Sequence, residues 1–187
     1  MSSTKPKAAV LVYDGVEELE CISVVDFLRR ADVDVVMLKC YCKEFVVTGL
    51  HKLGFRADEC FNGEITSKTF FDLIVVPGGR QMEFLKCSDS MDLIKHQHAN
   101  DKLLAICCTA LESVGKKSSI FTNKKVVDHP KLRELRIEGV EYVTDNVVVD
   151  GNLITALGLS SVFDLSRQCI SMLKGEAVAK DLFDNML

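Results

Sequence analysis

Two adjacent cysteines stand where an apolar run meets a helical pattern. Residues 103–107 are typical of a strand and Thr109 opens a helix, so Cys107 takes the last strand position and Cys108 follows it. A nucleophile at such a turn projects from the sheet, and a helix N-terminus can lower a cysteine pKa to about 3.5–7.5. We therefore expect Cys107 to be a reactive thiolate. Two buried, inert thiols in a tight turn are the alternative.

A carboxyl group on an apolar helix stripe is the second candidate for chemistry. Glu20 recurs at helical spacing with Val16 and Val24, so these three residues face the sheet together. A buried carboxylate costs several kcal/mol unless it is paired or protonated. Glu20 therefore either bends out to water or holds a raised pKa beside a reactive group. Glu17 and Glu18 project from other faces, and we expect them to be solvated.

The elements that must position these groups alternate between strands and helices. Apolar runs typical of parallel strands cover 8–13, 33–40, 73–77 and 102–107, and helical patterns cover 16–31, 89–100, 109–114 and 162–173. Asp150-Gly151 predicts a hairpin, and region 45–65 fits a small antiparallel excursion. The pattern predicts one α/β domain over residues 1–187 with a mainly parallel central sheet.

Three candidate features follow three of the predicted strands. They are Glu17, Glu18 and Glu20 after the first strand, Gly78-Gly79 after the third, and Cys107 at the end of the fourth. In an α/β sheet, ligands collect outside the carboxyl ends of the strands. We therefore expect these groups to converge at one edge of the sheet.

Composition narrows the classes of function. The 187 residues carry a net charge of −4, which excludes a broad basic surface for nucleic acid. No run approaches the roughly 18–20 apolar residues of a membrane span, and the first apolar run is too short for a secretory leader. Eight cysteines occur without the spacing of a zinc site. We expect no metal, no cofactor, and mostly reduced, buried thiols in a cytoplasmic protein.

Five motifs, taken in order, resemble the DJ/ThiJ/PfpI superfamily, and most closely its parkinsonism-associated deglycase branch. They are residues 14–20, 24–31, 71–79, 105–107 and 150–155. The resemblance covers most of the chain. It implies a flavodoxin-like three-layer sandwich with a small β-hairpin excursion, usually assembled as a homodimer.

The resemblance also implies roles for individual residues. Cys107 would be the reactive thiol, and Glu20 would be the buried carboxyl hydrogen-bonded to it. The backbone N–H groups of Gly79 and Cys108 would form an oxyanion hole. His129 matches a family histidine near the thiol, often across the dimer interface.

The expected pocket departs from the family pattern. We expect it to be lined by Gly78, His51 and Gly158. His51 and the segment 157–161 stand where close relatives carry arginines, so two cations that favour a thiolate are missing. Cys108-Thr109 follows the thiol where the family carries small residues. The protease and amidotransferase branches need a histidine there, and we exclude them.

These residues suit the chemistry of carbonyl compounds. A thiolate adds to an aldehyde, N–H donors hold the new oxyanion, and Glu20 moves a proton between the two carbons before water releases a hydroxy acid. We expect a glutathione-independent glyoxalase or deglycase that acts on a small carbonyl substrate such as methylglyoxal. The alternatives are a redox-sensing or chaperone-like homodimer whose Cys107 is oxidised, and a structural member with an inert cysteine.

Overall fold

A central sheet of seven strands organises the chain. The computed structural model describes residues 5–40, 44–60, 69–80 and 88–186. Within them the sheet has the order β10-β11-β7-β6-β1-β2-β5. Its strands are β1 (Lys7–Val12), β2 (Asp34–Lys39), β5 (Glu59–Cys60), β6 (Leu73–Val76), β7 (Leu103–Cys107), β10 (Val147–Asp150) and β11 (Leu153–Ala156). β10 pairs with β11 antiparallel, and the other neighbours in this sheet are parallel.

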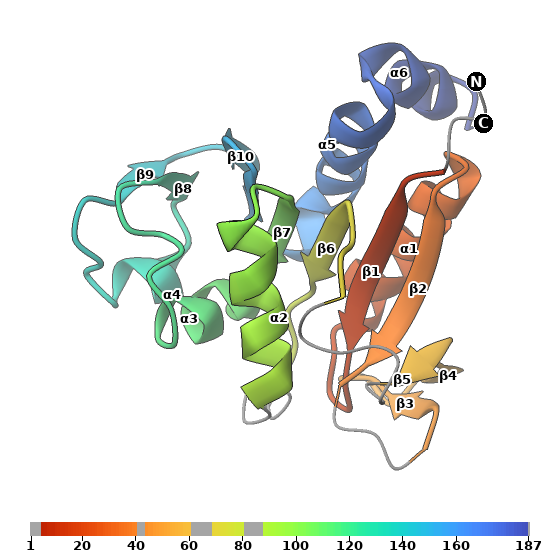
Figure 1. Cartoon of the computed structure of the whole chain (residues 1–187), viewed down its shortest axis with the longest axis horizontal. Coiled ribbons are helices and arrows are strands. Elements are labelled where there is room, and N and C mark those ends of the chain that lie inside the picture. Colours follow the sequence, from red (N-terminus) through yellow and green to blue (C-terminus); the bar gives the residue numbers. More distant parts are fainter. Residues whose placement is uncertain (1–4, 41–43, 61–68, 81–87, 187) are drawn as a thin grey trace.

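Helices cover both faces of this sheet. They are α1 (Glu18–Arg30), α2 (Ser88–Ala99), α3 (Thr109–Gly115), α4 (Pro130–Arg133), α5 (Val162–Lys174) and α6 (Glu176–Asp184). Figure 1 shows α2 in front of the strands and α1 behind β1 and β2, with α1 packed on α5 and α5 on α6. The predicted α/β sandwich with a mainly parallel sheet is confirmed. No helix in the described part of the chain has the length and apolar character to cross a membrane.

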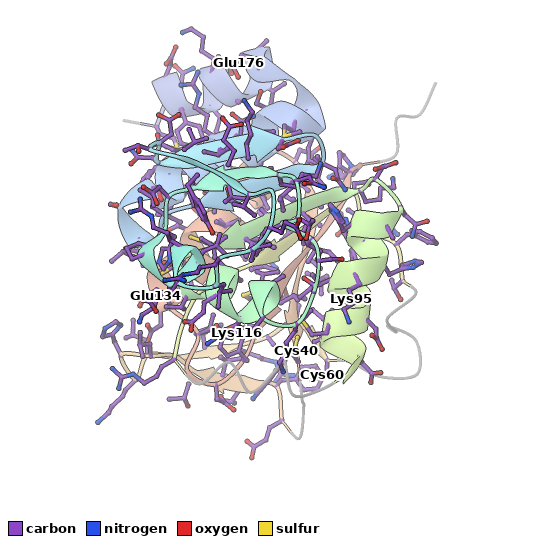
Figure 2. All side chains as sticks on the ribbon, turned by 90° about the vertical axis from the view of Figure 1, so that its left-hand side faces the viewer. Cys40, Cys60, Lys95, Lys116, Glu134 and Glu176 are labelled. Atoms are coloured by element: carbon purple, nitrogen blue, oxygen red, sulfur yellow. The ribbon has the colours of Figure 1, made fainter. Side chains whose placement is uncertain are left out.

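The inner strands are apolar at successive positions because helices cover them on both sides. Ala8 to Val12 of β1 are fully buried, and so are Leu73, Ile74 and Val76 of β6. Charged side chains project from the outer surface, as Figure 2 shows for Lys95 on α2 and Glu176 on α6. Burial of the apolar strands is therefore the main force that holds the layers together.

A small hairpin leaves the sheet after β2, as the sequence pattern predicts. β3 (Val46–Thr48) pairs antiparallel with β4 (Gly54–Arg56). Its tip returns to the start of α1, because Leu50 N–H donates to Val16 O at 2.8 Å and Gly15 N–H donates to Thr48 O at 2.7 Å. These bonds place the hairpin tip beside the first turn of α1.

Helix α1 begins two residues later than the apolar pattern predicts. Val16 forms an isolated antiparallel bridge with Gly79, and Glu17 keeps an extended backbone as the N-cap. The bridge holds the chain out of helical geometry until Glu18. Further along, Gly175 ends α5 with φ of +94°, a conformation that glycine adopts without steric cost.

A second excursion was not predicted from the sequence. β8 (Lys125–Val127) pairs parallel with β9 (Glu141–Val143), and β8 lies against β10 and β11 of the main sheet. Thr155 on β11 ties this pair to the main sheet, since Val127 N–H donates to its buried hydroxyl oxygen at 3.0 Å.

Replacing Thr155 by valine tests how much this link contributes to stability. Val127 is fully buried, so Thr155→Val leaves its N–H without an acceptor. We expect the free energy of unfolding, measured by urea denaturation, to fall by about 1–3 kcal/mol. Thr122→Val, at an exposed threonine, is the matched control and should change it by less than about 0.5 kcal/mol. Equal losses in the two variants would contradict the role of the hydroxyl.

Candidate active site

The turn between β7 and α3 holds Cys108 in a strained conformation. Its φ is +54° and its ψ is −130°, and α3 starts at the next residue. A residue with a side chain rarely adopts positive φ, and such strain concentrates at functional sites. Cys108 is partly exposed, whereas Cys107 is fully buried. The residue with positive φ at the turn is therefore Cys108, whereas Cys107, the expected reactive thiol, is the last residue of β7 as predicted.

Cys107 remains part of the sheet. It pairs in register with Ala156 of β11. Burial raises the pKa of its thiol well above the usual value, and the charge of Glu20 raises it further. The strand ends at Cys107, where the apolar pattern predicts its end.

Glu20 is buried beside the turn. Only 2% of the residue is exposed, and its Oε2 accepts a hydrogen bond of 2.8 Å from Gly78 N–H. Its Oε1 is buried without a hydrogen-bond partner among the described residues. Burial raises the pKa of this carboxyl, although the Gly78 N–H and the neighbouring Cys108 and Cys107 thiols act in the opposite direction. Of the two sequence-based alternatives, the structure shows the buried carboxyl.

Two glycines allow the sulfur and the carboxyl to approach one another. A Cβ at Gly158 would lie 3.2 Å from Cys108 Sγ and 3.6 Å from Glu20 Oε1, so both atoms border the same small space. A Cβ at Gly78 would lie 2.8 Å from Cys108 Cβ and 3.0 Å from Glu20 Oε2. Side chains at either position would crowd the pair. The structure thus brings Cys108, Glu20, Gly78 and Gly158 together.

The two N–H groups expected to form an oxyanion hole already have partners. Gly79 N–H donates to Thr109 Oγ1 at 2.9 Å, and the Thr109 hydroxyl donates back to Gly79 O at 2.9 Å. Cys108 N–H donates to Ala156 O at 3.1 Å, continuing the sheet. The predicted hole is therefore not open in this arrangement. The N–H of Thr109 hydrogen-bonds the Cys108 sulfur and stabilises its negative charge.

The surroundings of Cys108 disfavour its thiolate. Burial and then the Glu20 carboxylate raise the pKa of the thiol to about 11, outweighing the Thr109 N–H. The sequence analysis expected a lowered pKa from the helix N-terminus. The following helix is only seven residues long, and the nearby charges that affect the thiol are acidic. At neutral pH the sulfur therefore carries its proton, and the Glu20 carboxyl lies beside it.

The two histidines among the predicted site residues lie elsewhere. His129 precedes α4, and burial lowers the pKa of its imidazole, with Glu112 acting in the opposite direction. His51 lies on the hairpin tip with Nδ1 at 3.2 Å from Glu18 Oε2. Within the described ranges, neither histidine forms a hydrogen bond or ion pair with Cys108 or Glu20.

Tyr13 and Thr109 also border the site, and the sequence analysis did not assign a role to either. The Tyr13 hydroxyl donates to Pro77 O at 3.2 Å, and burial followed by the charge of Glu20 raises its pKa. Tyr13 directly follows β1, so the rule that ligands gather at the carboxyl ends of strands indicates its position. The bond between Thr109 and Gly79 joins distant parts of the chain, and no local pattern predicts it.

The other cysteines divide into buried thiols and a disulfide. Cys21 and Cys169 are buried free thiols whose pKa burial raises to about 12, which fits the prediction of small apolar residues. Cys60 is disulfide-bonded, so the prediction of reduced thiols is wrong at this position. Cys42 and Cys87 lie outside the described residues.

The sequence matches a family model and several known proteins. Residues 6–172 match the model of the DJ-1/PfpI family. The protein DJ-1 homolog A of Arabidopsis thaliana is 28% identical over 179 residues, which are 95% of this chain but 45% of the Arabidopsis protein. A Caenorhabditis elegans protein named glutathione-independent glyoxalase is 26% identical over 181 residues, 94% of this chain and 92% of that protein. Two further relatives, from Pyrococcus species, are named deglycases.

A solved structure agrees with the computed one over nearly the full length. A mutant of a DJ-1 superfamily protein from Salmonella typhimurium is 29% identical, with a TM-score of 0.86 and 97% of each chain covered. The match of the family model extends from the start of β1 into α5 and includes Glu20, Gly78, Cys108 and Gly158. With its fold and sequence both matched, the chain belongs to the DJ-1/PfpI family.

Proposed function

We propose that the protein is a cofactor-free cysteine enzyme that converts small reactive carbonyls such as methylglyoxal to hydroxy acids. Cys108 is the nucleophile, and Glu20 carries the proton. The observation that carries the proposal is the meeting of Cys108 Sγ and Glu20 Oε1 beside Gly158, with Cys108 held at a φ of +54°. Family membership and the relative named a glyoxalase support the choice of reaction.

The first step follows from the protonation of the pair. Because the thiol pKa is about 11, the sulfur does not attack as a preformed thiolate at neutral pH. Glu20 instead accepts the thiol proton while Sγ forms a bond to the aldehyde carbon. The carbonyl oxygen gains negative charge, and the N–H of Thr109, which already bonds the Cys108 sulfur, is our candidate donor to it. Protonation of this oxygen gives a hemithioacetal.

The second step moves hydrogen between the two carbons of the substrate. Glu20 removes the proton from the carbon bonded to sulfur and returns a proton to the neighbouring carbon, so the former ketone becomes an alcohol and the thiol-bound carbon becomes a thioester. Water then breaks the thioester bond, releases lactate from methylglyoxal and restores the thiol. The overall reaction adds one water molecule and needs no redox cofactor.

A redox-sensing role is the second candidate, and one observation favours it. The expected oxyanion donors, Gly79 N–H and Cys108 N–H, are already bonded, which disfavours addition to a carbonyl but does not affect oxidation of the sulfur. The partly exposed Cys108 thiol can instead reduce hydrogen peroxide to water and become a sulfenic acid, which a second peroxide converts to a sulfinic acid. Homodimer formation remains a prediction from the family resemblance, and a cytoplasmic location remains a prediction from the composition.

Lactate formation from methylglyoxal without glutathione tests the enzymatic proposal. Cys108→Ser should abolish turnover, and Glu20→Gln should lower kcat by roughly 100-fold or more, because proton transfer contributes about 10²–10⁴ in rate. Cys107→Ser, which changes the neighbouring buried sulfur, is the matched control and should keep most of the activity. Turnover that survives Cys108→Ser but is lost in Cys107→Ser would return the nucleophile to Cys107.

Alkylation by iodoacetamide, followed by mass spectrometry, tests the electrostatics of the pair. Cys108 should react before the fully buried Cys107, with a rate that rises as pH approaches the thiol pKa of about 11. Glu20→Gln removes a negative charge that opposes the thiolate, so the midpoint should move to lower pH. A wild-type midpoint at or below about 8.5, the value of a free thiol, would contradict the raised pKa.

A further inference from the structure

Glu18 does not lie in solvent as its place on the helix predicts. Only 4% of its side chain is exposed. Its Oε1 accepts hydrogen bonds from His51 N–H at 2.6 Å and Leu53 N–H at 3.3 Å, both from the hairpin tip. The chain passes so close that a Cβ at Gly49 would lie 2.2 Å from Glu18 Cγ. The hairpin therefore encloses this carboxylate and fixes its direction.

The second oxygen of this carboxylate faces an imidazole nitrogen. Glu18 Oε2 lies 3.2 Å from His51 Nδ1, and Glu17 Oε2 lies 3.6 Å from the same nitrogen. One ligand atom from each of the three side chains lies within 4.8 Å of the others. Two carboxylates and one imidazole thus converge from the start of α1 and the hairpin tip.

We propose that Glu17, Glu18 and His51 form a binding site for one divalent transition-metal ion, with Zn²⁺ the best match. Tetrahedral zinc bonds nitrogen and oxygen at about 2.0–2.2 Å, which places two of its ligand atoms roughly 3.3–3.5 Å apart. The nitrogen–oxygen distances of 3.2 and 3.6 Å bracket this separation. Small side-chain adjustments would therefore bring the three atoms into the first coordination shell of the ion.

The type and number of ligands select the class of metal. Ca²⁺ takes six to eight oxygen ligands, and Mg²⁺ demands octahedral oxygen coordination. An imidazole with two carboxylates suits zinc and its neighbours in the first transition row. The two carboxylates also balance the charge of a dication when the imidazole is neutral.

The site has the supporting contacts and the open side that a metal site needs. Two backbone N–H groups hold Glu18 in place, and Glu17 N–H donates to Gly78 O at 2.9 Å. Such outer contacts orient ligands and strengthen binding. The His51 side chain is 68% exposed, so the ion can enter from solvent and keep water as a fourth ligand.

A simple pair between the His51 ring and the two carboxylates would account for the same distances without any metal. Such a pair would bind no zinc, so a titration with zinc separates the two interpretations of these contacts.

Calorimetric titration of the full chain with Zn²⁺, after removal of metal by a chelator, tests the proposal. We expect one ion per chain and, by mass action, a higher melting temperature with zinc. Removal of a contact that only orients a ligand lowers metal affinity by about 10–100-fold. Removal of a ligand itself, in Glu17→Gln or His51→Gln, should therefore weaken zinc binding by at least about 100-fold. Glu18→Gln keeps an acceptor for the two backbone N–H groups and should weaken binding in a folded chain.

Matched controls come from residues outside the cluster. Glu138→Gln, at an exposed glutamate, and His96→Gln should bind zinc like the wild type. Cys108→Ser should also bind normally, and the cobalt-substituted protein should show no thiolate-to-cobalt absorption band. Zinc binding that is lost only in Cys108→Ser, equal affinity in all variants, or no binding would each overturn the proposal. Because lactate formation is measured separately, these results leave the proposed catalytic function untouched.

Discussion

The hydrogen bond from Gly78 N–H to Glu20 Oε2 is the contact on which the geometry of the candidate site depends. It connects the first turn of α1 to the chain just beyond β6 and satisfies one oxygen of a carboxylate that is almost fully buried. A buried charge without such a bond would favour unfolding or protonation. Because one oxygen is held in this way, the other remains available to the sulfur of Cys108. The same short segment also receives Glu17 N–H, so one strand end orients both ends of the first helical turn.

The architecture of the sheet could be predicted because burial on both faces leaves a strong signal. The uninterrupted apolar runs of β1 and β6 and the hairpin at Asp150-Gly151 all correspond to observed elements. The β8–β9 pair left little signal, because each strand has three residues and begins with a charged side chain. The start of α1 was missed by two residues because a bridge between Val16 and Gly79, distant in sequence, overrides the local helical pattern. The assignment of residues 1–187 to one single domain stays a prediction.

The site was less predictable, since its details depend on tertiary contacts. Helical spacing placed Glu20 on the inner face, and strand ends indicated Gly78 as a neighbour. The apolar pattern placed the end of β7 at Cys107, but it did not show that the next residue, Cys108, adopts positive φ and carries the partly exposed sulfur. The burial of Glu18 depends on a hairpin more than thirty residues away in the chain, so its helix position alone predicted solvent. For the same reason, no sequence spacing suggested that His51 would meet two glutamates.

Under the proposed function, Thr109 lies where the family resemblance places part of an oxyanion hole. Its hydroxyl both accepts from Gly79 N–H and donates to Gly79 O, so it takes the place that a charged oxygen would have at this N–H. A substrate whose oxyanion used Gly79 N–H would first displace the hydroxyl and break both of these hydrogen bonds. Only carbonyl compounds whose adducts concentrate negative charge on oxygen would then be strong enough acceptors to replace it.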